Sequence, residues 1–339
     1  RSDIIQYNIE QRLRESHTQN RKSIPISFTK LVEGAQRLAA AVILTRKTDI
    51  GVPAFVRAKD NLNASTILPD WNNDEILRLL ESGIFNDIIY GAVRFRHRDT
   101  REFLAAQWFS KLLNGDNRFL TERLFFREQF GEKIVVPSLR SILPWLILLD
   151  ERICQDVMKL QPEIAFESGD PAQLPVSIRK RLFSQFVERI AKNQDDRTIR
   201  DNDSIAKITD FDLEDEVLSL IKTYHDNEDV IFFLGRMVWQ GKFTKCISLL
   251  TPIALDSKRS MYSRRVSARA IMACGSREEK IDLWANLNQS GEELDRGLIV
   301  ELISEIDHDH EFISLLIDSL RNATLYKRFE HSGLNAVLE

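Results

Sequence analysis

The sequence predicts a mainly α-helical protein, and three observations support this prediction. Glycine (13) and proline (9) are scarce among the 339 residues, whereas residues that favour helices are abundant. Apolar residues recur at helical spacing in many short segments. Residues 84–97 form the exception, because they read as a two-stranded ribbon between helices. This order predicts a winged-helix domain followed by an α-solenoid, a stack of short helical hairpins.

Composition excludes several classes of partner. The net charge of −4 gives no overall attraction for nucleic acid or membranes. The longest apolar run is about seven residues, whereas a helix that crosses a bilayer needs roughly 20. The first residues are charged throughout and do not resemble a secretory signal, so we expect a cytoplasmic protein. Cys154, Cys246 and Cys274 are far apart, and we expect buried free thiols.

Residues 1–47 are predicted to form a helical domain. Two segments have apolar residues on one helical stripe, at 3–15 and at 27–46. Ser27 precedes the second stripe and is a suitable N-cap, because its hydroxyl can accept a hydrogen bond from the first turn.

Residues 48–114 are predicted to form the winged helix. A connector with a short strand leads to a helix over about 72–83, and the ribbon follows. The next helix, 100–113, is apolar nearly all round, which is typical of a helix packed between layers. Asp99 is expected to cap it, with Glu102 completing a capping box.

His97 stands at the end of the ribbon and is the candidate functional residue. Strand alternation places Val93, Phe95 and His97 on one face and the arginines at 94, 96 and 98 on the other, so we expect an inward imidazole. An imidazole beside a helix N-terminus is suited to contact a phosphate. The alternative is a core histidine that bonds Asp99 or a backbone carbonyl.

Residues 115–339 are predicted to form the α-solenoid. Gly241 and Gly275 each separate two helices and lie 34 residues apart, and the pattern around the second glycine looks like HEAT repeats. Tetratricopeptide repeats and an irregular helical array are the alternatives. An acidic linker is expected at about 193–212. The predicted helices are 137–148, 150–160, 177–192, 212–224, 228–240, 243–255, 261–274, 277–288, 292–306 and 309–322.

Motifs for catalysis are missing from the sequence. It has no phosphate-binding P-loop, no dinucleotide-binding glycine motif, no nucleophile elbow and no zinc-protease motif. His308 and His310 are two residues apart near a helix start, where the neighbouring Asp residues more simply cap the helix than bind a metal. We therefore expect no catalytic residue and no metal site in this chain.

Three stretches together resemble a known family. These are "ILPDWNNDEILRLLESGIF", "FRHRDTREFLAAQWFSKLL" and "PEIAFESGDPAQLPVSIRKRLFSQFVERI". They are similar to the end of the winged-helix domain, and the helices that follow it, in NACHT-type STAND NTPases. The resemblance covers about 65–190, and covers 1–45 more weakly as the helical domain behind the NTPase core.

The resemblance implies a regulatory and sensor portion of an ATP-dependent signalling switch. The family's motif histidine contacts the β-phosphate of ADP and holds the inactive state, which implies this role for His97. The parent protein would bind ADP or ATP, but this chain alone would hold no nucleotide tightly. Implied partners are the NTPase core of the same polypeptide, a protein ligand on the helical repeats, and further copies on activation. In bacteria the family is associated with antiphage defence.

Two other functions compete with this one. A winged helix often reads DNA, but neither predicted helix is polar enough to be a recognition helix, so we do not expect nucleic-acid binding. The other alternative is a non-enzymatic adaptor, whose helical repeats bind a protein partner without any nucleotide switch.

Overall fold

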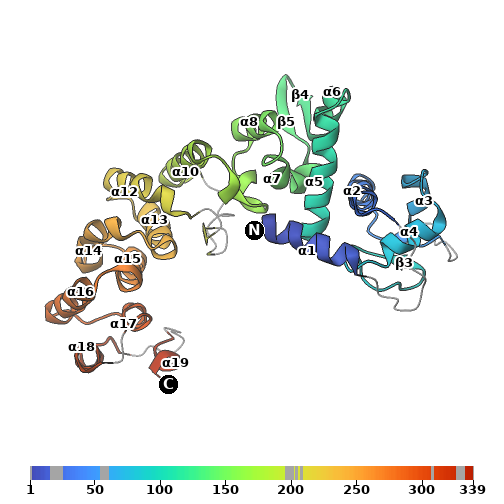
Figure 1. Ribbon diagram of the computed structural model, residues 1–339. Helices are drawn as coiled ribbons and strands as arrows, with labels where there is room; N and C mark the ends of the chain where they lie inside the picture. Colours follow the sequence, from blue (N-terminus) through green and yellow to red (C-terminus); the bar gives the residue numbers. More distant parts are fainter. Residues whose placement is uncertain are drawn as a thin grey trace. The chain divides into compact units, whose positions relative to one another are not determined.

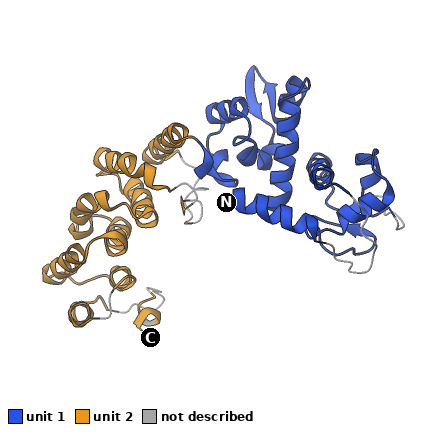
Figure 2. Ribbon diagram, viewed as in Figure 1, with its two compact units in different colours: residues 1–174 blue, residues 175–339 orange. Residues whose placement is uncertain are grey.

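The chain is mainly α-helical and divides into two compact units, Arg1–Leu174 and Pro175–Glu339 (Figures 1 and 2). A computed structural model describes residues 2–15, 26–53, 61–194, 202, 205–206, 209–306, 309–325 and 333–338. Within these ranges, no helix has both the length and the apolar character needed to cross a bilayer. The expected domain boundaries after residues 47 and 114 both fall inside the first unit.

The first unit combines helices with two small sheets. Its helices are α1 (Ser2–Arg14), α2 (Phe28–Thr45), α3 (Ala64–Ile67), α4 (Asn73–Leu80), α5 (Arg98–Leu113), α6 (Arg118–Phe125), α7 (Leu143–Leu146), α8 (Glu151–Leu160) and α9 (Ile164–Glu167), with 3₁₀ turns η1 (Pro137–Ile142) and η2 (Pro171–Gln173). Its strands are β1 (Ile50–Gly51), β2 (Leu62–Asn63), β3 (Ala92–Val93), β4 (Phe126–Gln129) and β5 (Glu132–Val135).

Helix α5 is the centre of the first unit and packs against α1, α2, α6 and α7 (Figure 1). Its residues Leu104, Ala105 and Ala106 have no exposed surface, as expected of a helix between layers. On α2, the predicted stripe is buried and Ser27 caps the helix by accepting from the Lys30 amide. These predictions are confirmed.

The predicted ribbon is present as a short hairpin before α5. Phe85 pairs with Phe95 and Ile89 with Ala92, and Tyr90 and Gly91 form the turn with φ of 51° and 71°. Positive φ at both central positions matches a tight hairpin turn. The second arm contains β3, which pairs antiparallel with β1, and β1 pairs parallel with β2. The short strand expected in the connector is therefore confirmed.

A second hairpin, β4–β5, was not predicted. Its register pairs Phe126 with Val135, and its turn at Phe130 and Gly131 again has positive φ at both residues. The helix predicted at 137–148 is also partly wrong. Residues 137–142 are a 3₁₀ turn, and only 143–146 are α-helical. Pro137 and Pro144 each stand in a first turn, the position where a missing amide proton is tolerated.

The described residues of the second unit are mainly helical, and the observed helices from α10 to α18 match the predicted ones in order, whereas α19 was not predicted. They are α10 (Val176–Ala191), α12 (Glu214–Thr223), α13 (Glu228–Gly241), α14 (Ile247–Leu255), α15 (Met261–Cys274), α16 (Arg277–Gln289), α17 (Arg296–Ile303), α18 (His310–Arg321) and α19 (Leu334–Leu338), with 3₁₀ turns η3 (Phe211–Leu213) and η4 (Thr244–Cys246). The predicted helix 292–306 is shorter than expected, because Asp295 caps α17 by accepting from the Leu298 amide.

The helices of the second unit lie in two rows (Figure 1). In one row α13 packs against α15, α15 against α17 and α17 against α19, while in the other α14 packs against α16 and α16 against α18. Many polar contacts between elements of this unit join residues 30 to 36 positions apart in sequence. Lys245 bonds Asp215, and Trp284 donates to Ser319. This spacing agrees with the 34 residues between the two glycines.

Most of the expected acidic linker at 193–212 lies outside the described residues. Several described positions in it make contacts, and Asp212 accepts from Arg179 at 2.9 Å. The side chain of Ile205 is buried, and the Oδ1 atom of Asn202 accepts from Arg236 at 2.9 Å.

Candidate functional site

His97 lies at the junction between the hairpin and α5. The last ladder hydrogen bond before it runs from the Arg96 amide to the Ile84 carbonyl, and α5 begins at Arg98 with His97 as its N-cap residue. The imidazole makes no capping hydrogen bond to the first turn. The expectation that Asp99 caps this helix is wrong, since Asp99 is the second residue of α5.

The His97 side chain is exposed, so the predicted inward orientation is wrong. Alternation holds only within the paired arm. There Val93 is buried, Phe95 is half-buried against Phe85 at 4.6 Å between ring centroids, and Arg94 and Arg96 are exposed. Beyond the last ladder bond the chain enters the helix, and strand periodicity no longer decides where side chains point. The alternative of a buried core histidine is also wrong for this position.

The exposed ring lines a pocket of about 590 Å³ between α1 and the start of α5. Helix α1 supplies one apolar wall, in which Ile5 is half-buried and Ile9 is buried. The start of α5 supplies the opposite wall. The lining residues are Ile4, Ile5, Asn8, Ile9, Arg12, Ile84, His97, Arg98, Asp99 and Thr100.

Helix α1 is held in place at its C-terminal end by the segment before the hairpin. The Gly83 amide donates to the Arg12 carbonyl at 2.8 Å, and Arg78 donates to the carbonyls of Arg14 and Glu15. A Cβ atom at Gly83 would lie 2.7 Å from the Glu15 carboxylate and 3.3 Å from the Arg12 carbonyl. A larger residue would therefore require the Glu15 side chain to move and the α1 backbone to shift by a few tenths of an ångström.

A chain of amide side chains joins α1 to α5 and α2. Gln107 on α5 donates to Gln6 on α1 at 3.0 Å and accepts from Gln36 on α2 at 2.9 Å. Lys111 donates to the Gln36 oxygen at 2.7 Å. These bonds fix both walls of the pocket relative to each other, because each of these amides gives and receives a hydrogen bond.

The pocket is lined by charges of both signs. Arg12 and Arg98 are cationic, and Asp99 is the single acid among the lining residues. Arg98 is already paired, since its Nε donates to the buried carboxylate of Glu102 at 2.7 Å. The first-turn amides of α5 carry partial positive charge in the same place. With Arg98 paired, Arg12 and the first-turn amides of α5 are the groups of this pocket suited to a phosphate or carboxylate.

The predicted Glu102 capping box is wrong, and the structure shows another role for this residue. Its side chain is only 1% exposed and lies on the inner side of α5. Glu102 therefore pairs with Arg98, four residues earlier, instead of reaching back to a capping residue. The pairing compensates a buried negative charge.

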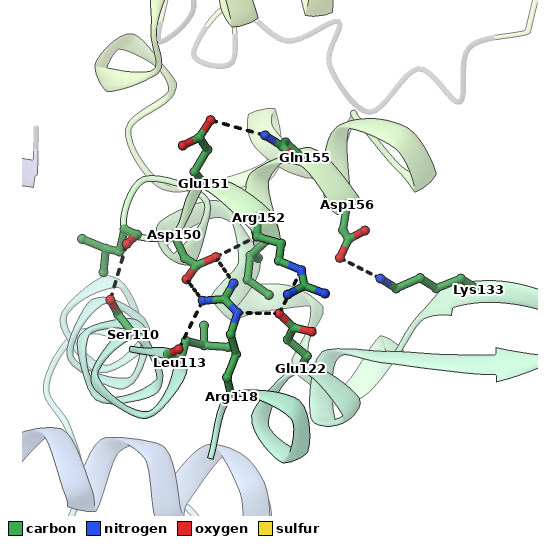
Figure 3. A network of polar contacts seen from close by, with 12 residues as sticks. Ser110, Leu113, Arg118, Glu122, Lys133, Asp150, Glu151, Arg152, Gln155 and Asp156 are labelled. Carbon is green, nitrogen blue, oxygen red and sulfur yellow. Dashed lines mark hydrogen bonds and ion pairs between the residues drawn. The ribbon is translucent and has the colours of Figure 1, made fainter. Parts of the chain in front are cut away.

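A second polar cluster joins the C-terminal half of α5 to α6 and α8 (Figure 3). Arg118 donates to both oxygens of Asp150, to Glu122 at 2.8 Å and to the Leu113 carbonyl at 3.2 Å. Asp150 also caps α8 by accepting from the Ile153 amide. Burial raises the pKa of Asp150, but the hydrogen bonds from Arg118 and Ile153 outweigh burial and lower it. With its polar atoms paired, this cluster holds the fold together.

The sequence around His308 and His310 predicted a capping cluster and no metal site, and the structure describes it in part. His308 lies outside the described residues, and His310 is exposed at the start of α18. Asp309 caps α18 by accepting from the amides of Glu311 and Phe312, as predicted for the acids there. Among the described residues, no group of three or more His, Cys, Asp or Glu side chains is placed to hold a metal ion.

The three cysteines are free thiols as predicted, but only two of them are buried. Cys154 and Cys246 are buried, and Cys274 is half-buried with its thiol donating to the Val238 carbonyl at 3.4 Å. Burial raises the pKa of Cys246 to about 12 and that of Cys274 to about 11. Because the thiolate is the nucleophile, neither residue is suited to nucleophilic chemistry.

Comparisons with protein-family models, with curated proteins and with solved structures found no match. The function therefore has to be argued from the site and the fold.

Proposed function

We propose that this chain is the regulatory and sensor portion of a STAND NTPase of the NACHT type. In this proposal residues 48–114 are a winged helix, and the helices of the second unit are a HEAT-like α-solenoid. The winged helix holds the ADP-bound inactive state of a neighbouring NTPase core. The solenoid binds a protein ligand, which releases that contact and permits oligomerisation.

The observation that carries the proposal is the order of elements: helix α4, then the hairpin, then the buried helix α5 with His97 at its start. The His97 ring is exposed and lines the pocket between α1 and α5 together with Arg12, which is not the inward position that the sequence predicted. A nucleotide held by another module can reach such a ring, whereas a core histidine would be unreachable. The imidazole would donate to the β-phosphate, and α1 would cover one side of the contact.

The winged-helix assignment is supported by the order of elements around the hairpin. Helix α4 precedes the hairpin, α5 follows it, and β1 adds a third strand beside β3. DNA binding is disfavoured by the pairing of the nearby arginines. Arg94 makes two hydrogen bonds to Asp49, and Arg98 is bonded to Glu102. Phosphate contacts to DNA need such cations to be available.

The solenoid assignment is supported by the two rows of helices and by the repeated sequence separation of their polar contacts. In a repeat array each unit contacts its neighbours, so one sequence separation recurs along the stack. The adaptor function is the second candidate. It is favoured because the second unit forms a compact body of its own.

Nucleotide analysis of the purified full-length gene product tests the proposal. The protein is denatured, and released nucleotides are separated by anion-exchange chromatography. Bound ADP in a near-stoichiometric amount supports the switch. A full-length protein that contains no nucleotide and takes up no radiolabelled ADP or ATP would favour the adaptor.

A further inference from the structure

The pocket between α1 and the start of α5 is elongated along α1. Positions 4, 5, 8, 9 and 12 of that helix line it, and this spacing forms one stripe over about two helical turns. With a rise of about 1.5 Å per residue, Ile4 and Arg12 lie about 12 Å apart along the helix axis. A single phosphate contact at His97 uses only part of such a site.

The wall towards the N-terminus of α1 is apolar. Ile5 is half-buried there, and Ile9 follows one turn later and is buried. Ile84, from the segment before the hairpin, adds another buried side chain. Water that covers an apolar wall is displaced favourably by an apolar ligand. An inorganic anion offers no apolar surface, so this wall indicates a ligand with an apolar body.

Arg12 lies at the other end of the stripe, is half-buried and has donors available. Its Nη1 donates to the Gly83 carbonyl at 3.4 Å, which is a long hydrogen bond. In the part of the chain that the structure describes, no carboxylate pairs with Arg12. A guanidinium has several N–H donors, so most of its hydrogen-bonding capacity remains open to a ligand.

The other arginine of the pocket already has acidic partners. The hydrogen bond to Glu102 raises the pKa of Arg98, and attraction to the charge of Asp99 raises it further. Arg98 is thus shared between two carboxylates, and Arg12 is the arginine of the pocket that an added anion can pair with. Asn8 and Thr100 contribute neutral polar groups to the same lining.

We propose that this pocket binds an organic monocarboxylic acid with an extended apolar chain. The carboxylate pairs with the guanidinium fork of Arg12, because one carboxylate matches one guanidinium in charge and in shape. The apolar chain runs from there along Ile9 and Ile5 towards the N-terminus of α1. The proposal concerns this chain alone and does not depend on a nucleotide contact at His97.

Isothermal titration calorimetry of the 339-residue chain at neutral pH tests the proposal with three probes. Octanoate, whose extended chain is about as long as the stripe, is expected to bind with a Kd on the order of 100 µM. Butanoate should bind at least about tenfold more weakly, because it covers less of the apolar wall. Octylammonium has the same chain and the opposite charge, and it should show no measurable binding.

Two arginine variants test the polar end. Arg12→Gln should weaken octanoate binding by at least about tenfold, from the loss of a charge-assisted pair of hydrogen bonds. Arg14→Gln is the matched control in the same last turn of α1, since Arg14 does not line the pocket and stacks on Phe28 at 4.9 Å. This control should bind octanoate like the wild type.

A third variant tests the apolar end. Ile5→Gln should weaken octanoate binding several-fold and leave butanoate binding unchanged, because only the longer chain reaches Ile5. Circular dichroism checks that each variant folds. Equal binding of octanoate and octylammonium, or equal octanoate affinity in Arg12→Gln and Arg14→Gln, would overturn the proposal. Binding of inorganic phosphate without binding of octanoate would also overturn it, and would leave the proposed phosphate contact at His97 standing.

Discussion

Arg118 and Asp150 form a two-pronged ion pair between helices α6 and α8, with Nη1 at 3.0 Å from Oδ2 and Nη2 at 2.9 Å from Oδ1. The pair is largely shielded from water, since the Asp150 side chain is 5% exposed. Because Asp150 also caps α8, one carboxylate positions three segments of the first unit. The following prediction rests on this relationship.

We expect Asp150→Ala to destabilise the first unit by about 3 kcal/mol, because it removes a helix cap and two charged hydrogen bonds of Arg118, which keeps Glu122 and the Leu113 carbonyl as partners. Urea unfolding followed by tryptophan fluorescence measures the change. The control is Lys133→Ala, which removes a more exposed pair with Asp156 and should cost less than about 1 kcal/mol. Equal losses in the two variants would show that Arg118 and Asp150 contribute no more than a surface pair.

The lowered pKa of Asp150 predicts how this contribution depends on pH. The carboxyl is more acidic in the folded state than its usual value of about 3.9 in an unfolded chain. Its contribution is therefore complete above about pH 4 and is lost as pH falls through the lower, folded pKa. The stability difference between wild type and Asp150→Asn should be constant from pH 5 to 7 and shrink below pH 4. A difference that grows on acidification would contradict the pairing.

Ser319 connects α18 to α16 and should matter to the second unit. Its hydroxyl accepts from Trp284 Nε1 and lies 2.7 Å from Asn288 Oδ1, and the side chain is fully buried. Ser319→Ala should cost about 1–3 kcal/mol, because it leaves a buried indole N–H without a partner. Ser314→Ala on the exposed side of the same helix is the control and should change the unfolding free energy by less than about 0.5 kcal/mol.

Gly235 lets α13 approach α15 closely. A Cβ atom at this position would lie 2.9 Å from Val266 Cγ1. Although alanine favours a helix over glycine by about 1 kcal/mol, we expect Gly235→Ala to destabilise the chain, because the clash outweighs the propensity. In a Val266→Ala background the same substitution should become neutral or stabilising. A double-mutant cycle from urea unfolding measures this coupling, and additive effects would rule out the contact.

Much of the helical order was predictable from sequence because caps and stripes are local signals. The helix at 261–274 has the predicted ends, and Ser27 caps α2 as expected. The β4–β5 hairpin escaped prediction because residues 127–134 are exposed on both faces and show no alternation. Its turn uses Phe130 before Gly131, whereas such turns usually carry Asn or Asp in that position.

The site was only partly predictable. The sequence indicated His97 and the charged start of α5 as the site. Strand alternation, however, predicted the wrong orientation for the His97 imidazole. Strand alternation was assumed to reach His97, but the last ladder hydrogen bond is made by the amide of Arg96, one residue earlier. One wall of the pocket is α1, and its residue Ile5 is more than 90 positions from His97 in sequence. No local sequence pattern relates two segments so far apart. Arg118 and Asp150 were missed for the same reason.

The most direct measurement compares ADP retention by two variants of the full-length protein, His97→Leu and His225→Leu. His225 is an exposed histidine of the second unit and controls for loss of a surface imidazole. The account predicts that His97→Leu retains at least about tenfold less ADP after gel filtration, from the loss of a charge-assisted phosphate contact, while His225→Leu retains as much as the wild type. Equal ADP retention by both variants would contradict a phosphate contact at His97.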